Sequence, residues 1–341
     1  MPPVDTSNDH SLTYDVVAIG NALVDVIGSV PEAFLDAEGV TKGSMTLVDA
    51  QRSAHLFSRI SETVQTSGGS AANTAYGLAS LGGRAGFIGK IAEDDFGRAF
   101  GYDLRKVGVG FHPGGVSTTE PTGACIIAVT PDGQRSMSTF LGAASLLEPD
   151  DIARDVVAAG AVLFLEGYLF DRDAAKEAFR VASKYAHEAG RKVALTLSDS
   201  FCVDRHRADF MDLILNDIDV LFCNEFELMS LYQTDSYDEA LAQLRDDCEF
   251  GAVTRDKRGS VVINGHDLVH IEAEPVDHVV DATGAGDLYA AGFLYGFTRG
   301  MSIEACGRLG SISASEVITH VGPRPLVKLH SLIPQELLVT R

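Results

Sequence analysis

Short apolar runs alternate with longer amphipathic stretches along most of the chain. Buried strands are predicted from compact apolar runs at residues 14–19, 85–88, 162–165, 192–197, 220–223 and 252–254. Helices are predicted at residues 71–81 and 172–189, the second because its alanines and one phenylalanine form a single apolar stripe. Strands and helices in this alternation predict an α/β fold, in which helices cover both faces of a mainly parallel sheet.

Two regions, residues 27–47 and 111–140, interrupt this alternation. Both are richer in Gly, Pro, Ser and Thr, and a turn composition at residues 131–133 follows a strand-like piece at residues 123–129. These regions could decorate the surface, or they could form a small sheet that closes over a substrate as a lid. Because the chain has no internal repeat, low-complexity segment or linker-like stretch, we expect a single domain over residues 1–341.

The charge balance excludes two classes of partner. With 27 basic and 48 acidic residues, the net charge is −21, which repels nucleic acids and anionic membrane surfaces. We therefore expect neither a nucleic acid nor a membrane as partner, and a small molecule instead. The acidity does not exclude a nucleotide, because backbone N–H groups at a helix N-terminus can bind an anion locally.

The cysteines and the N-terminal residues indicate a cytoplasmic protein. Five cysteines are scattered without any Cys-x-x-Cys pair, which predicts reduced thiols and no disulfide framework or zinc site. The first residues lack a basic stretch followed by an apolar one, so no secretory signal is visible. No apolar run approaches the length of a membrane span.

The strongest candidate for chemistry is a glycine-rich turn at residues 281–287 (DATGAGD), which leads into an apolar helical run. Gly284 and Gly286 permit a tight turn whose backbone N–H groups converge, and the following helix adds the positive end of its dipole. A phosphoryl group could be stabilised there, and Asp287 could take the proton of an attacking alcohol. The alternative is that Asp287 only caps the helix after a glycine turn.

Two further segments could bind a ligand. Residues 68–75 (GGSAANTA) form a second glycine turn that opens a helix, with Asn73 one helical turn beyond Ser70, although Ser70 could simply be a capping residue. Residues 21–25 (NALVD) directly follow the first strand. A carboxylate at the carboxyl end of a strand suits a ligand rich in hydroxyls, but loops often carry Asn and Asp.

Other nucleotide-binding motifs are absent. A P-loop would need a glycine at Arg84 and Ser or Thr after Gly89-Lys90, where the chain has Ile91. The turn after the first strand lacks the Gly-x-Gly-x-x-Gly of dinucleotide-binding proteins, and the protein-kinase signatures are missing.

Taken together, the three segments resemble the ribokinase (PfkB-type) family. Asp-x-Thr-Gly-Ala-Gly-Asp, Gly-Gly-x-x-x-Asn and Asn-x-x-x-Asp agree with that family in order and spacing, and the resemblance covers about residues 14–325. It implies a ribokinase-like three-layer α/β/α fold with a small β lid. It also implies an ATP- and Mg²⁺-dependent kinase that phosphorylates an alcohol, with K⁺ as a candidate further cation.

Within the family, several segments are similar to those of adenosine kinases: Gly-Asn-x-x-x-Asp ending at Asp25, Gly-Gly-Ser at residues 68–70, Pro-Thr-Gly-Ala-Cys at 121–125 and Asp-Gly-Gln-Arg-Ser at 132–136. The chain differs from mammalian-type adenosine kinases at Thr283-Gly284, where those have Thr-Asn-Gly or a similar sequence. The resemblance therefore implies the 5′-hydroxyl of adenosine as acceptor, and a ribose- or fructose-like sugar as the alternative.

The resemblance also assigns site residues. The catalytic residues are the base Asp287 and the anion-hole residues Gly284, Ala285 and Gly286. The acceptor is expected to contact Asn21, Asp25, Gly68, Gly69, Ser70 and Asn73. ATP is expected to contact Arg135, Asn224, Thr254 and Gly259. Mg²⁺ is expected at Glu227 through water, and a monovalent cation at Asp281 and Thr283.

Three alternatives stay open at the level of sequence. Glu227 could be an exposed helix acid and Arg135 an exposed hairpin charge. The chain could also be a catalytically silent nucleoside-binding protein that kept the fold, although the intact Asp287 turn argues against this. The chain is expected to be a monomer or a homodimer.

Overall fold

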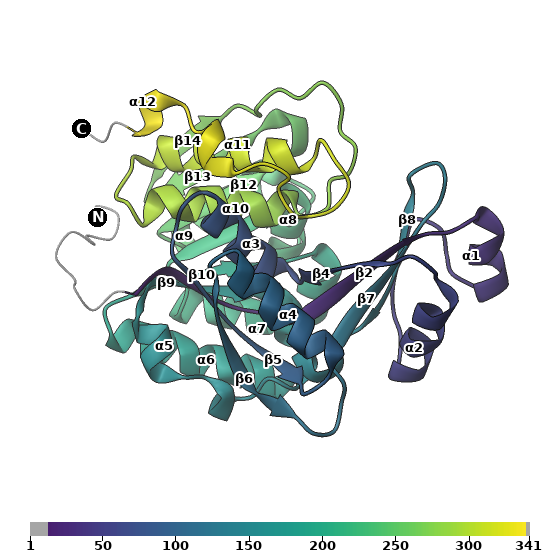
Figure 1. The fold of residues 1–341 in the computed structure, drawn as a ribbon. Coiled ribbons are helices and arrows are strands. Elements are labelled where there is room, and N and C mark those ends of the chain that lie inside the picture. The colour runs from purple at the N-terminus through teal and green to yellow at the C-terminus, as the bar shows by residue number, and fades with distance from the viewer. Residues whose placement is uncertain (1–12, 339–341) are drawn as a thin grey trace.

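A computed structural model of the chain describes residues 13–338, and its largest feature is a nine-stranded sheet (Figure 1). In spatial order the strands are β14 (Asp267–Ile271), β13 (Ser260–Asn264), β12 (Phe250–Thr254), β11 (Val220–Asn224), β10 (Lys192–Thr196), β9 (Gly160–Glu166), β1 (Tyr14–Ile19), β5 (Ala85–Ala92) and β6 (Gly110–Ser117). The strands from β12 to β6 are parallel, whereas β13 and β14 are antiparallel additions.

Helices cover both faces of this sheet, which confirms the three-layer α/β prediction. One layer contains α3 (Ser70–Ser80), α4 (Asp95–Lys106), α10 (Ala285–Phe297) and α11 (Ile303–Val317). The other layer contains α5 (Arg154–Ala158), α6 (Asp173–Glu188), α7 (Ser200–Asn216), α8 (Glu225–Tyr232) and α9 (Tyr237–Asp247). Side chains of a strand alternate between the layers, so Val16 and Ala18 face the first and Val17 and Ile19 the second.

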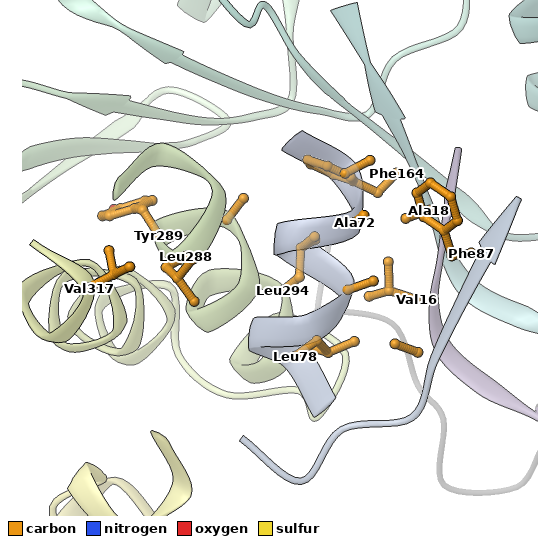
Figure 2. Packing of buried hydrophobic residues seen from close by; sticks show 14 of the residues in the cluster. Val16, Ala18, Ala72, Leu78, Phe87, Phe164, Leu288, Tyr289, Leu294 and Val317 are labelled. Carbon is orange, nitrogen blue, oxygen red and sulfur yellow. The ribbon is translucent and has the colours of Figure 1, made fainter. Parts of the chain in front are cut away.

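The close packing of α3 against α10 brings the two glycine turns of the sequence together. A Cβ atom at Gly77 of α3 would lie 2.5 Å from Leu288 Cδ1 and 2.8 Å from Ala291 Cβ, so only a glycine permits this approach. Figure 2 shows α3 between α10 and the strands, with Ala72 and Leu78 close to Val16 and Ala18 of β1. Both helices therefore begin at the same end of the sheet, where the parallel strands have their carboxyl ends.

A second, five-stranded sheet projects from the main body (Figure 1). Its strands, in spatial order, are β3 (Met45–Leu47), β8 (Arg135–Phe140), β7 (Gly123–Val129), β2 (Leu23–Ser29) and β4 (Val64–Gly68). One face packs against α1 (Glu32–Glu38) and α2 (Ala50–Arg59), through residues such as Val24, Val26, Leu35 and Leu56. The opposite face carries Asp25, since side chains alternate along β2.

The expected lid segments differ in detail from this second sheet. From residues 111–140 it takes β7 and β8, whereas β6 lies at the edge of the large sheet. It also takes β4, which lies outside both expected segments and has only one large apolar side chain, Val64. The turn expected at residues 131–133 connects β7 and β8, with Gly133 at a φ of 83°.

Short helical segments complete the described chain: η1 (Gly142–Leu146), η2 (Pro149–Asp151), η3 (Gly167–Asp171), η4 (Asp256–Arg258), η5 (Leu329–Leu332) and α12 (Gln335–Leu338). Within residues 13–338, none of the helices combines the length and apolar character that a membrane crossing requires.

Candidate active site

The turn at residues 281–287 has the geometry of an anion-binding site. Gly284 adopts a φ of 82° at the N-cap of α10, and a Cβ there would lie 2.6 Å from Pro323 Cβ, so the position requires glycine. No side chain caps α10, and the N–H of Ala285 donates to the backbone oxygen of Ala282 at 3.2 Å. The N–H groups of Gly286 and Asp287 have no partner among the described residues, so they and the positive dipole end are available. At Gly286, a Cβ would meet no atom within 4 Å, so open space adjoins the first turn of the helix.

Asp287 points from the first turn of α10 toward α3. Its Oδ1 accepts a hydrogen bond from Ser70 Oγ at 2.6 Å, and its Oδ2 accepts one from Asn73 Nδ2 at 2.8 Å. Both donors belong to α3, so the carboxylate joins two helices and does not cap its own. Burial raises the pKa of Asp287, while these two hydrogen bonds and the charge of Arg324 oppose the rise.

The acceptor residues expected from the sequence lie beside this carboxylate. The Asp25 carboxyl lies directly over Gly68, where a Cβ would be 2.5 Å from its Cγ. Gly69, at a φ of 96°, leaves room for the backbone oxygen of Asn21, which would be 2.1 Å from a Cβ. Burial raises the pKa of Asp25 to about 6, although the positive charges of Arg324 and Arg135 lower it.

Two buried amides present oxygens that could accept hydrogen bonds from a ligand. Asn21 donates through Nδ2 to Glu166 Oε1 at 2.7 Å, and the amide nitrogen of Asn73 is used by Asp287. The Oδ1 atoms of Asn21 and Asn73 are both buried, and neither accepts a hydrogen bond from the described residues. Buried acceptors of this kind are usually satisfied by water or a ligand, and a ligand hydroxyl fits them.

Glu166, at the end of β9, belongs to the same cluster and was missed by the sequence analysis. Its side chain is almost fully buried and accepts from Asn21 Nδ2 and, at 2.8 Å, from the backbone N–H of Ala71. Burial raises its pKa to about 7. Glu166 could have been predicted from the sequence, because it directly follows the apolar run of a buried strand. The same kind of position made residues 21–25 a candidate.

Arg135 reaches the turn at residues 281–287 from the second sheet. It forms an ion pair with Asp281, and only 8% of its side chain is exposed, so it is not an exposed hairpin charge. Its Nε and Nη2 atoms are buried and have no partner among the described residues. These two free donors remain available for an anion.

Asp281 stabilises the turn at residues 281–287 through hydrogen bonds to its side chain. Its Oδ1 accepts from the backbone N–H of Thr283 at 2.9 Å and from the Thr283 hydroxyl at 2.6 Å, while its Oδ2 accepts from Gly322 N at 2.9 Å. The hydrogen bonds from Thr283, Gly322 and Arg135 outweigh the effect of burial and lower its pKa to about 2. These bonds give Asp281 and Thr283 a structural role, and the cation role stays a prediction.

Asn224 and Glu227 form a capping box at the start of α8. The Asn224 side chain accepts from the N–H groups of Phe226 and Glu227, and Glu227 Oε2 accepts from Asn224 N at 2.9 Å. Glu227 is 6% exposed, so it is not an exposed helix acid. Burial raises its pKa to about 7, and the negative charges of Asp199 and Asp287 act in the same direction.

Thr254 and Gly259, the other two residues expected to contact ATP, lie on either side of η4. Gly259 has a φ of 76°, and a Cβ there would lie 1.9 Å from the backbone oxygen of Ile271. The fold alone therefore requires this glycine. Within the described part of the chain, neither residue forms a hydrogen bond with the Asp287 cluster.

The residues suit Mg²⁺ held mainly by water and phosphate. Over residues 13–338, no three His, Cys, Asp or Glu side chains are grouped so that they could ligate a metal directly. Burial is the main cause of the raised pKa of Glu227, and the negative charges of Asp199 and Asp287 add to it, so both carboxylates act on Glu227. Mg²⁺ prefers oxygen donors and usually keeps several waters, which fits a role for Glu227 through water.

Comparisons with known proteins identify the family of the chain. Residues 15–328 match the model of the pfkB family carbohydrate kinases. The chain is 28% identical to adenosine kinase of Saccharomyces cerevisiae over 92% of this chain and 97% of that protein. It is 27% identical to 5-dehydro-2-deoxygluconokinase of Bacillus subtilis over 90% of each.

Solved structures give the same result. A probable sugar kinase from Rhizobium etli superposes with a TM-score of 0.88 at 44% identity, covering 96% of this chain and 100% of that one. Adenosine kinase from Sinorhizobium meliloti superposes with a TM-score of 0.85 at 48% identity, covering 94% and 98%. Since the family match spans nearly the whole chain, the protein belongs to the pfkB family of carbohydrate kinases and is itself a kinase.

Proposed function

We propose that the chain transfers the γ-phosphoryl group of ATP to the 5′-hydroxyl of adenosine, with Asp287 as the general base. The observation that carries this proposal is the Asp287 carboxylate, held by Ser70 and Asn73 beside the open space at Gly286. An acceptor hydroxyl next to Asp287 would lose its proton to the carboxylate as it attacks. Gly284, Ala285 and Gly286 would stabilise the transferred group through backbone N–H groups and the α10 dipole.

The ribose would be held by the buried polar groups around this base. The Asp25 carboxylate would accept from two ribose hydroxyls, and the free oxygens of Asn21 and Asn73 offer further acceptors. Gly68 and Gly69 allow the backbone to approach the sugar closely, since side chains there would collide with Asp25 and Asn21.

The face of the second sheet that carries Asp25 also carries apolar side chains, and we propose that this sheet acts as the lid. Cys125 lies opposite both Asp25 and Thr139 in the sheet, so these residues share a face. By alternation along the strands, Ile127 and Met137 lie on the same face. We propose that the purine packs against this face, since a flat base gains most from stacking and desolvation on apolar side chains, and a free sugar has no such base.

The nucleotide side of the site follows from the resemblance. Arg135 would turn its two free donors to phosphate, and Thr254 and Gly259 would contact the nucleotide. Asn224 and Glu227 would orient the water shell of Mg²⁺. When bound, Mg²⁺ would neutralise the negative charge of the phosphates.

We propose a cytoplasmic location and a role in purine salvage. All five cysteines are buried and unpaired, which suits a reducing compartment. Adenosine is a salvageable nucleoside, and its phosphorylation retains it as a nucleotide.

Adenosine and sugar acceptors can be separated by direct competition. A sugar kinase is the second candidate, because B. subtilis 5-dehydro-2-deoxygluconokinase and the R. etli probable sugar kinase are also similar to the chain. Equal concentrations of adenosine and of ribose, fructose or 5-dehydro-2-deoxygluconate should be incubated with limiting ATP. We expect phosphate mainly on adenosine. Phosphate mainly on a sugar would overturn the adenosine assignment, and no transfer to any acceptor would favour a silent binding protein.

A further inference from the structure

The loop after α11 places an arginine behind the candidate active site. Arg324 Nη1 donates to the backbone oxygen of Ala72 at 3.0 Å, and its Nε donates to the backbone oxygen of Ser67 at 3.2 Å. Its Nη2 donates to the same Ser67 oxygen and, at 2.8 Å, to Ser67 Oγ. Its guanidinium carbon also lies 4.3 Å from the centre of the Tyr76 ring. One guanidinium therefore holds both ends of the segment 67–72.

That segment seats the two acids of the candidate active site. Asp25 lies over Gly68, and Ser70 donates to Asp287 at 2.6 Å. A shift of the segment would move both carboxylates relative to each other. Arg324 could not be identified from the sequence, because only the tertiary structure brings residue 324 next to residues 67–72.

The charge of Arg324 acts in the same place as its hydrogen bonds. It lowers the pKa values of both Asp25 and Asp287, which burial raises. Asp103 of α4 also interacts with the charge of Arg324, and it accepts from Ser67 N at 2.9 Å and from Ser67 Oγ. Asp103 therefore helps to fix the same segment at Ser67.

Other charged groups surround the two acids. Arg135 of β8 also faces Asp25, and Asp287 itself faces Asp25. The acids Glu166 at the end of β9 and Glu227 of α8, and Tyr168 of η3, face Asp287. Because Glu166, Glu227 and Tyr168 are acidic or neutral, they do not replace the positive charge of Arg324 at Asp287.

We propose that Arg324 is a positioning residue for phosphoryl transfer, which fixes segment 67–72 beneath Asp25 and Asp287 and supplies the positive charge that both acids share. The inference rests on the proposed function of these two acids. It adds a residue from outside the motifs to the machinery of the reaction.

Three variants separate the charge of Arg324 from its packing. Arg324→Gln removes the charge, whereas Arg324→Lys keeps it but cannot reproduce the guanidinium fork. Arg299→Gln is the matched control: Arg299 also stacks on a tyrosine, at 3.7 Å from the Tyr295 ring, and also donates to a backbone oxygen, that of Tyr295. It pairs with Asp15 at the start of β1, away from the carboxyl ends of the strands.

The kinetic readout is the pH profile of kcat/KM for the acceptor that wild type prefers. We expect Arg324→Gln to lose about 10- to 100-fold, the cost of a lost charged hydrogen bond, and its acidic limb to move to higher pH. Arg324→Lys should lose activity with the limb in the wild-type place. Arg299→Gln should leave the limb unchanged even where it lowers the melting temperature. If the limb of Arg324→Gln coincides with that of wild type, the charge role is wrong.

A second readout needs neither an acceptor nor turnover. Carboxyl ¹³C NMR of the free protein follows the titration of Asp25 and Asp287, identified by their loss in Asp25→Asn and Asp287→Asn. Both resonances should titrate at higher pH in Arg324→Gln, and unchanged titrations would overturn the inference. If Arg324→Gln does not fold, the Arg324→Lys variant tests both roles. A wild-type kcat in Arg324→Lys would refute the positioning role. Titrations of Asp25 and Asp287 that are displaced from those of wild type would refute the charge role. A wild type without kinase activity would instead refute the proposed function.

Discussion

Arg135 of β8 is ion-paired with Asp281, so the second sheet is linked directly to the turn that begins α10. Both side chains are about nine-tenths buried, and Asp281 has further donors in Thr283 and Gly322, whereas Arg135 has no second acceptor among the described residues. The pair therefore holds the second sheet against this turn, and Asp281 has other hydrogen-bond partners whereas Arg135 has none among the described residues.

Because Asp281 has more hydrogen-bond partners than Arg135, replacing either residue should lower the free energy of unfolding by a different amount. Asp281→Asn leaves a buried guanidinium without its carboxylate and should cost about 3–5 kcal/mol of unfolding free energy. Arg135→Met should cost less, because Asp281 keeps its other donors. Urea unfolding of both variants measures the difference. The exposed pair Arg205–Asp171 is the control, and Arg205→Met should cost less than about 1 kcal/mol. Equal costs for the two buried variants would contradict this description.

Two glycines of the same turn should respond differently to alanine. At Gly284 the positive φ and the contact with Pro323 predict a loss of about 1–3 kcal/mol in unfolding free energy. Gly286→Ala should leave the unfolding free energy unchanged, because its methyl group meets no atom. That methyl would occupy space next to the transferred phosphoryl group, so kcat should fall on the order of 10²-fold. A stable and fully active Gly286→Ala enzyme would show that the phosphoryl group does not bind there.

Asp25 predicts a pH dependence of acceptor binding. Its pKa of about 6 means that the carboxylate becomes protonated as the pH falls through 6, so acceptor affinity in wild type should weaken there. Asp25→Asn should bind the acceptor about 10- to 100-fold more weakly at neutral pH, and this pH dependence should disappear. Calorimetric titration of acceptor from pH 5 to 8 tests both effects. ATP affinity without acceptor is the control and should stay unchanged.

Glu166 predicts a pH dependence of stability. Its pKa is raised from 4.5 to about 7, so the folded state favours the protonated acid. Its contribution to stability is therefore fully present below pH 4.5 and is lost as the pH rises through 7. Glu166→Gln cannot titrate and should flatten the fall of melting temperature over this range. Part of the fall should persist, because the pKa of Glu227 is also raised to about 7.

The control for this experiment is Glu188→Gln, which alters a half-exposed acid in an ion pair with Arg154. Its stability profile should follow that of wild type. A Glu166→Gln protein with the full wild-type slope would show that Glu166 does not titrate in this range.

The central strands and the glycine turns could be predicted from the sequence because their signals are local. The apolar run at residues 14–19 is β1, and the apolar run 123–129 is β7. Gly284 and Gly69 could be predicted because both adopt a positive φ, and glycine is the residue that adopts such a backbone without steric strain. The same local reasoning made Asp287, between a glycine turn and an apolar helix, a candidate base, and the family resemblance favoured that role over a helix cap.

The rest depends on contacts between distant parts of the chain. β4 has the sequence VQTSG, with too little apolar content to indicate a strand, and exists because it pairs with β2. Glu166 acquires its position through Asn21, 145 residues away, and Arg324 through Ser67, 257 residues away. Such partners are set by tertiary packing, which no local pattern in the sequence records.

The most direct test of the central claim is the turnover of Asp287→Asn with ATP and adenosine. The amide keeps the shape of the side chain but cannot accept the hydroxyl proton. We expect kcat to fall by roughly 10² to 10⁴ relative to wild type, the usual contribution of general base catalysis, while ATP affinity stays the same. A folded Asp287→Asn enzyme that forms AMP and ADP at a near-normal rate would show that Asp287 is not the base.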